Sequence, residues 1–509
     1  MLRETCTENG RVRGIAASDP RITVYRGIPF AKPPVGELRW RAPQPAENWE
    51  GVRSCDTFGP PSMQELPGSE PGFYTKEFYV VPDRPMSEDC LYLNVWTPAE
   101  KADEKLPVMV WLFGGGMVAG CTSEPEFDGE RIAKRGVVLV SVNYRLNAFG
   151  FLACPELTGE GREKHEPGTN FGLLDQSAGL RWVRRNIAYF GGDPDNVTLF
   201  GQSAGGRCTW MHIASPGDRG LFRRAIVQSG GMGGGITRYP GLAAAEEAGT
   251  RFLEHLGVSG IGEARKMDAA EIRDKALSFT GYRWGPVIDG HTLPRSPLAA
   301  LASGKINDVQ LLLGSTLRDP DGFRAGNDPE AFMGRAAAVY GGELEEFRRL
   351  AKIRTAADLA AYYESPEFST FEIGNAYTAE QFRAQGRKPV YLYRFNPEMP
   401  GDGAGSFHSS DLWFVFESLS RCWRPFRGKH YDLARQMCTY WTNFAKSGDP
   451  NGPDDDGAPL PEWKPSGGDG RYVQYFGDVP ELRREELSPL MRFELRRVAE
   501  TAEKEMREG

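Results

Sequence analysis

The chain has 509 residues and a formal net charge of −8, with acidic and basic residues interspersed, which argues against a nucleic-acid partner. No run of about 18 apolar residues could span a membrane, and the first ten residues contain no apolar signal core. A cytoplasmic protein with no membrane partner is therefore expected, and its eight cysteines, which lack the spacing of metal ligands, are expected to be free thiols.

The predicted elements alternate along the chain between strands and helices. Residues 11–15 and 22–25 predict an N-terminal β-meander, and the stretch 27–36, rich in proline and glycine, predicts a rigid extended loop without regular structure. Further strands are expected at Leu91–Trp96, Pro107–Phe113, Val137–Val142, Asn196–Phe200, Ala225–Gln228, Val309–Leu313, Pro389–Phe395 and Tyr472–Phe476. Helical patterns lie between them, and a charged helix over roughly 484–507 ends the chain. This order predicts an α/β protein with a mostly parallel, doubly wound sheet.

A candidate nucleophile lies between one of these strands and the helix that follows it. Gly201-Gln202-Ser203-Ala204-Gly205 has the pattern G-x-S-x-G, which is typical of a nucleophile elbow that exposes the Ser203 hydroxyl above the sheet. The pattern alone is weak in a chain with 61 glycines, because an ordinary glycine-rich turn is the alternative. A base, an acid and an oxyanion hole must therefore be found elsewhere.

The end of the 107–113 strand offers the oxyanion hole. Gly114, Gly115 and Gly116 follow it directly, and glycines let backbone N–H groups approach a reacting carbonyl oxygen. Together with the N–H of Ala204, the residue after Ser203, they would form the hole.

The base is expected among six histidines, well downstream of Ser203. His408 lies in a glycine-rich turn after a strand, which suits a general base, although composition alone separates it little from His291. His212 reads as structural and His430 as a surface residue.

The acid is expected after the 309–313 strand. The segment Gly314–Phe323 contains two aspartates, Asp319 and Asp321, and either could hold the imidazole in the required tautomer. An aspartate before proline or glycine is also common turn chemistry.

Many motifs, in order, resemble the type-B carboxylesterase family, the cholinesterase-like α/β-hydrolases that include bacterial para-nitrobenzyl esterases. The matching segments are Arg26–Ala31, Glu88–Val95, Trp111–Gly116, Asn143–Leu146, Phe190–Pro194, Gly201–Gly205, Pro286–Gly290 and Phe407–Leu412. The resemblance covers almost the whole chain, so it implies an α/β-hydrolase fold with residues 1–509 as a single domain. It also implies that insertions around 58–85, 230–285 and 320–385 shape the substrate pocket.

The resemblance implies a catalytic set by position. Ser203 becomes the nucleophile and His408 the general base, while Gly115, Gly116 and Ala204 donate the oxyanion hole. The family acid is usually glutamate in a G-x-x-x-D-E-G-x-x-F segment. Ungapped alignment over 314–323 places Asp319 at that glutamate and leaves Asp321 as the alternative acid.

Three departures from the family pattern bear on function. Gln202 stands where a glutamate is usual, which weakens the case for a cationic, choline-like substrate. Phe113 replaces a common His or Tyr before the glycines. Ser62 stands where a cysteine often pairs with Cys90, so this disulfide is expected to be absent.

The resulting hypothesis is a serine carboxylic-ester hydrolase that acts on small-molecule esters through an acyl-enzyme, without metal or organic cofactor. An amidase or lactonase on the same triad, and a non-catalytic binding module on the same fold, are the alternatives. Monomer and homodimer are both open. A set of aromatic residues in the insertions either lines an apolar gorge or belongs to the core: Phe73, Tyr74, Phe78, Tyr79, Tyr282 and Trp284.

Overall fold

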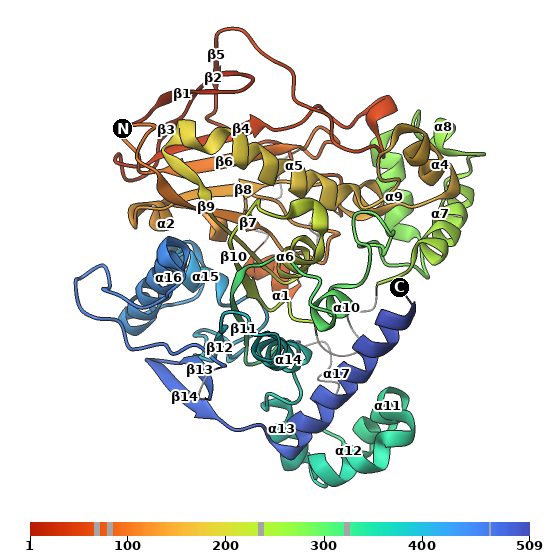
Figure 1. Ribbon diagram of the computed structural model, residues 1–509, viewed down its shortest axis with the longest axis vertical. Helices are drawn as coiled ribbons and strands as arrows, with labels where there is room; N and C mark the ends of the chain where they lie inside the picture. The colour runs from red at the N-terminus through yellow and green to blue at the C-terminus, as the bar shows by residue number, and fades with distance from the viewer. Residues whose placement is uncertain (66–71, 79–84, 233–238, 320–325, 468–469, 509) are drawn as a thin grey trace.

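The computed structural model describes residues 1–65, 72–78, 85–232, 239–319, 326–467 and 470–508. Within these residues, eleven strands form one sheet (Figure 1). Their spatial order is β14 (Pro480–Glu485), β13 (Arg471–Phe476), β12 (Tyr391–Phe395), β11 (Gln310–Thr316), β10 (Arg224–Gln228), β9 (Gly192–Gln202), β7 (Leu106–Leu112), β8 (Val138–Val142), β6 (Tyr92–Thr97), β4 (Thr23–Pro29) and β3 (Ile15–Ala16). Neighbours from β13 to β8 pair in parallel, and the strands at both edges pair antiparallel. The predicted mostly parallel sheet is thus confirmed.

Both faces of the central strands are buried, which explains their nearly continuous apolar sequence. Successive side chains of a strand point to opposite faces. In β7, Val108 and Val110 accordingly belong to one hydrophobic cluster, whereas Met109 and Trp111 belong to a second. The sheet therefore separates two cores.

Helices cover each face. The first core is closed by α5 (Phe171–Asn186), α6 (Ala204–Ala214), α10 (Pro297–Ala302) and α14 (Thr370–Ala384). The second is closed by α2 (Glu130–Lys134), α15 (Leu412–Val415) and α16 (Gly428–Ser447). Since α6 contacts β7, β9 and β10, the helix after the expected elbow lies over the middle of the sheet.

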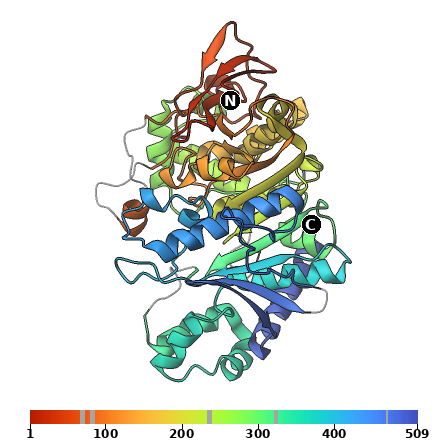
Figure 2. The same ribbon diagram turned by 90° about the vertical axis from the view of Figure 1, so that its left-hand side faces the viewer.

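The two ends of the long axis carry smaller units (Figures 1 and 2). Near the N-terminus, a separate sheet joins β1 (Glu4–Thr7), β2 (Gly10–Arg13) and β5 (Val52–Ser54). At the other end, α11 (Pro329–Tyr340), α12 (Leu344–Ala351) and α13 (Ala356–Tyr363) pack around their own apolar cluster with the start of α17 (Pro489–Glu508).

Two expectations about element boundaries are wrong. The stretch 27–36 is not entirely irregular, because β4 continues to Pro29 by pairing with β6 across a register shift. The C-terminal helix begins at Pro489 rather than near 484, because residues 480–485 form the edge strand β14 on β13. Across the described ranges, every helix is too short or too polar to cross a membrane.

Candidate active site

Ser203 lies at a sharp turn between β9 and α6. Its backbone has φ 55° and ψ −120°, a conformation that non-glycine residues rarely adopt, and its N–H donates a hydrogen bond to Gln228 O at 2.9 Å. A Cβ atom at Gly201 would lie 2.5 Å from the Gly205 carbonyl carbon, and one at Gly205 would overlap the Leu112 carbonyl oxygen. The two glycines are therefore required by the close approach of backbone segments, as expected for an elbow.

Loops after two neighbouring parallel strands bring His408 and Asp319 together. Asp319 follows β11 and His408 follows β12, and the loops join through a parallel bridge between Arg318 and Phe407. The Arg318 N–H donates to Ser406 O at 3.1 Å. Gly405 (φ 63°) leaves room for the Arg318 side chain, because a Cβ atom there would lie 2.5 Å from Arg318 Cζ.

The three side chains form a continuous hydrogen-bonded chain. His408 Nε2 lies 2.8 Å from Ser203 Oγ, and His408 Nδ1 bonds Asp319 Oδ1. A carboxylate can only accept, so Nδ1 carries the proton and Nε2 is left to accept the Ser203 hydroxyl proton. This arrangement can move a proton from the serine to the imidazole.

Further hydrogen bonds hold the Asp319 carboxylate in place. Its Oδ2 accepts hydrogen bonds from Ser229 Oγ and, at 3.0 Å, from the Thr316 N–H, and the side chain is fully buried. Asp319, whose side chain is one methylene shorter than glutamate, reaches His408 because the loop after β11 lies close to the loop after β12. The alternative acid, Asp321, lies outside the described residues.

The surroundings of His408 raise its pKa above the ordinary value. Burial opposes protonation, but the charge and hydrogen bond of Asp319 outweigh it; Asp411 also raises the pKa, and Arg207 lowers it. Phe371 of α14 stacks on the imidazole with 6.0 Å between ring centroids and 10° between planes. The ring is therefore oriented by a face contact as well as by its two hydrogen bonds.

Asp411 and Ser229 are two polar neighbours that sequence reasoning missed. Asp411 Oδ2 accepts hydrogen bonds from Gln228 Nε2 at 3.0 Å and Tyr393 Oη at 2.9 Å, and burial raises its pKa to about 6. Ser229 follows β10 directly with φ 45°. The position of polar residues at the carboxyl ends of parallel strands was the signal that could have found them.

The glycine run after β7 lies against the elbow. A Cβ atom at Gly114 would be 3.1 Å from Ser203 Cβ, and Gly115 and Gly116 have φ values of 91° and 68°. Gln64 anchors the far side of this loop by exchanging two hydrogen bonds with the Gly120 backbone, at 2.8 and 3.0 Å. In the described part of the chain, no hydrogen bond uses the N–H groups of Gly115, Gly116 or Ala204.

The other histidines lie away from this arrangement. His291 is exposed, and His212 is buried between Asp218 and Gln176, with 2.8 Å to each. The interpretation of His430 as a surface residue is wrong: it is 5% exposed, because its ring packs on Phe426 and accepts a backbone hydrogen bond near the start of α16.

The aromatic residues of the insertions divide between core and surface. Trp284 is buried against Phe252 and Phe279, and Tyr282 packs beside it, so both belong to the core. Phe78 is also buried. Phe73 and Tyr74 are exposed on α1 (Phe73–Glu77), although Phe73 contacts Phe407, the residue before His408. Tyr79 lies outside the described residues.

Cys90, which the family pattern often pairs in a disulfide, is a free thiol in this protein. All eight cysteines are free thiols, and Cys90 is buried in hydrogen-bond contact with Ser62. Ser62 therefore occupies the place beside Cys90 that a disulfide partner would need.

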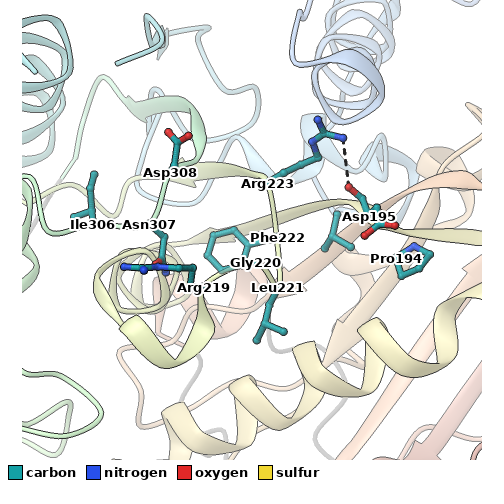
Figure 3. Close-up of a pocket in the computed structure, with 11 residues that line it drawn as sticks. Pro194, Asp195, Arg219, Gly220, Leu221, Phe222, Arg223, Ile306, Asn307 and Asp308 are labelled. Carbon is teal, nitrogen blue, oxygen red and sulfur yellow. Dashed lines mark hydrogen bonds between the residues drawn. The ribbon is translucent and has the colours of Figure 1, made fainter. Parts of the chain in front are cut away.

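A cavity of about 530 Å³ lies at the opposite end of the strands (Figure 3). It is lined by the first residues of β9 and by the segments that lead into β10 and β11, including Asp195, Arg219 and Asp308. None of the predicted site residues lines it. In open α/β sheets ligands bind at the carboxyl ends of strands, so this cavity is not the candidate active site.

A family model described as the carboxylesterase family matches residues 3–358 and 356–477. An acetylcholinesterase of Bungarus fasciatus is 32% identical over 515 residues, covering 92% of this chain and 82% of the relative. A para-nitrobenzyl esterase of Bacillus subtilis (strain 168) is 33% identical over 475 residues, covering 87% and 90%. The crystal structure of a Geobacillus stearothermophilus carboxylesterase at pH 6.2 aligns with a TM-score of 0.77 and 34% identity, covering 97% of this chain and 99% of that one.

Proposed function

Because the chain belongs to the carboxylesterase family, has its α/β-hydrolase fold and is an ester-hydrolysing enzyme, we propose that Ser203, His408 and Asp319 are its catalytic triad. The observation that carries the proposal is the hydrogen-bonded chain from Ser203 Oγ through the imidazole to the buried Asp319 carboxylate. Three side chains that lie far apart in sequence meet there, and their hydrogen bonds leave His408 Nε2 free to accept the Ser203 proton, as acyl transfer requires.

Acylation begins when Ser203 Oγ attacks the ester carbonyl carbon and passes its proton to His408 Nε2. The new carbon–oxygen bond converts the carbonyl oxygen into an oxyanion. The tetrahedral intermediate collapses by breaking the bond to the alcohol, which takes the proton from Nε2 as it leaves. The enzyme then holds the acid as an ester of Ser203.

Deacylation repeats these steps with water. Water attacks the acyl carbon and gives a proton to His408 Nε2, and the bond to Ser203 Oγ breaks as the serine recovers that proton. The free acid leaves. Asp319 holds the Nδ1 proton and stabilises the imidazolium in both halves, and neither half uses a metal or an organic cofactor.

The oxyanion is assigned to the N–H groups of Gly115, Gly116 and Ala204. Support comes from the glycine run packed against Ser203 Cβ, and from the absence of another acceptor for these N–H groups among the described residues. Ala204 is also the first residue of α6, where the helix dipole favours negative charge.

The chain is proposed to act as one domain whose insertions shape the pocket. The 58–85 insertion supports this by anchoring the glycine loop through Gln64, and the 320–385 insertion by the contact of Phe371 with His408. The helices α11–α13 instead pack on α17, so only part of the 320–385 insertion is expected to contact substrate.

Hydrolysis of para-nitrophenyl esters of increasing acyl length tests the proposal. We expect wild type to release nitrophenolate and Ser203→Ala to lose at least about 10⁴-fold in kcat, because nucleophile and base act as a unit. The matched control is Ser18→Ala, at an exposed serine, which should equal wild type. Turnover that survives in folded Ser203→Ala would contradict the triad, and faster cleavage of para-nitroanilides than of esters would favour an amidase.

A further inference from the structure

The helix after the nucleophile carries one residue that is not buried. Every residue of α6 except Arg207 is buried. Arg207 lies one turn beyond Ser203 and donates its backbone N–H to Ser203 O at 3.0 Å. A cationic side chain with partial access to solvent thus starts on the helix that positions the nucleophile.

A second arginine lies beside the glycine loop of the candidate oxyanion hole. Arg283 is exposed, whereas its neighbours Tyr282 and Trp284 pack into the core and anchor the segment. A Cβ atom at Gly116 would lie 3.4 Å from Arg283 Nη2, so the guanidinium lies against the glycine loop.

Neither guanidinium is paired with a carboxylate among the described residues. Arg207 Nε is buried without a hydrogen-bond partner. Burial lowers the pKa of Arg283, and Arg207 lowers it further by repulsion, with only Tyr239 opposing. The two cations are therefore close enough to repel each other, and no carboxylate of the described residues forms an ion pair with either of them.

Three arginines that are more deeply buried than Arg207 and Arg283 are each paired with a carboxylate. Arg145 pairs with Asp175 at 2.7 Å, Arg394 with Glu372 at 2.7 Å, and Arg424 with Glu77 at 2.8 Å. Two neighbouring cations without a counter-ion repel each other, and this repulsion costs more free energy where part of the surrounding water has been removed. A bound anion would relieve that cost, and a guanidinium matches a carboxylate in a bidentate geometry.

We propose that Arg207 and Arg283 bind a free carboxylate of the substrate, so that the preferred esters carry a second acid group close to the scissile bond. This inference rests on the proposed function and specifies its substrate class. The residue before the nucleophile, Gln202, is uncharged and does not repel such an anion.

Paired substrates test the inference on each side of the ester. On the acyl side, mono-para-nitrophenyl adipate is compared with para-nitrophenyl hexanoate; on the alcohol side, 4-acetoxybenzoate is compared with phenyl acetate. The readout is the ratio of kcat/KM for the anionic ester over its neutral partner. Wild type should favour the anionic member of at least one pair, chiefly through KM, and the preference should weaken as salt is raised.

Arg283→Gln and Arg207→Gln should each lower that ratio by about 10- to 100-fold, the range for a lost charge-assisted contact. The exposed Arg283 is the safer variant for folding, and the neutral ester reports on folding in each protein. Arg219→Gln is the matched control, because this exposed arginine lines the cavity at the opposite end of the strands (Figure 3), and its ratio should equal that of wild type.

The possible failures can be told apart. Neutral esters cleaved by wild type, with no anionic preference and an unchanged ratio in both arginine variants, would overturn the inference and leave the proposed function standing. A wild type that is folded but cleaves none of the four esters would contradict the proposed function and this inference with it.

Discussion

The reactivity of a single residue, His408, depends on neighbouring charges, of which Asp319 and Arg207 are far away in the sequence. Asp319 raises its pKa and fixes its tautomer, while Asp411 and Arg207 act on it in opposite directions. Asp319 is in turn held by Ser229 and Thr316. Substitutions of these charges should therefore change the pH dependence of the reaction as well as its rate.

Asp319→Asn tests the proposed acid. An asparagine cannot stabilise the imidazolium and can favour the wrong tautomer, so we expect kcat for a para-nitrophenyl ester to fall by about 10⁴-fold. Asp321→Asn is the matched control and should cost no more than a few-fold. If folded Asp321→Asn loses the larger share of activity, the role of acid belongs to Asp321.

The pH profile of kcat/KM tests the environment of His408. The base must be neutral, so activity should disappear as pH falls through the pKa of His408, which is raised above its ordinary value of 6.5. Asp411→Asn removes a charge that raises this pKa, so its acid limb should move to lower pH. Arg207→Gln removes a charge that lowers the pKa and should move the limb to higher pH. Identical limbs in wild type and both variants would show that another group controls the profile.

At the scale of elements, the candidate site is made by loops that follow adjacent strands. The glycine loop follows β7 and the elbow follows β9, while Ser229, Asp319 and His408 follow β10, β11 and β12. The carboxyl ends of parallel strands lie at one edge of the sheet, so strand order brings these loops together.

Gly115→Ala tests the glycine loop. Gly115 has φ 91°, and a Cβ atom there would overlap the Ala119 carbonyl oxygen, so the loop must shift. We expect kcat to fall by about 10²–10³-fold, the typical cost of losing one oxyanion donor. Gly136→Ala is the control, because Gly136 also has positive φ (75°) but has open space around it and precedes β8. Equal activity losses in the two variants would contradict the special role of Gly115.

At the scale of the whole molecule, stability and catalysis are assigned to different regions. The cluster between α11–α13 and α17 includes Phe347, which is fully buried and stacks on Tyr340 with 4.0 Å between centroids. It is separate from the two cores that flank the sheet. This cluster should therefore support folding without determining the chemistry.

Phe347→Ala should lower the free energy of unfolding by about 3–5 kcal/mol, because it leaves a cavity in that cluster. Urea unfolding followed by circular dichroism would measure the loss. Val339→Ala in α11, at a side chain that is 61% exposed, should change stability by no more than about 0.5 kcal/mol. At urea concentrations well below its unfolding transition, Phe347→Ala should hydrolyse esters as fast as wild type. A loss of kcat in this folded variant would show that the cluster between α11–α13 and α17 is coupled to the active site.

The sequence by itself determined the elements and the position of the elbow, because these depend on local patterns. Apolar runs predicted the central strands to within a few residues, and G-x-S-x-G between strand and helix indicated Ser203. The errors fell where tertiary pairing overrides local composition, as in the extension of β4 to Pro29 on β6 and in the edge strand β14.

Only the tertiary structure decided which side chains meet. No local sequence pattern shows that an aspartate at position 319 can reach His408, where the family usually has the longer glutamate. The bridge between Arg318 and Phe407 brings the two loops together and so places Asp319 within hydrogen-bond distance of His408. Ser229 and Asp411 were missed because their roles depend on the order β10, β11 and β12 in the sheet. Local periodicity encodes each element, whereas the distances between loops are set by strand order and register.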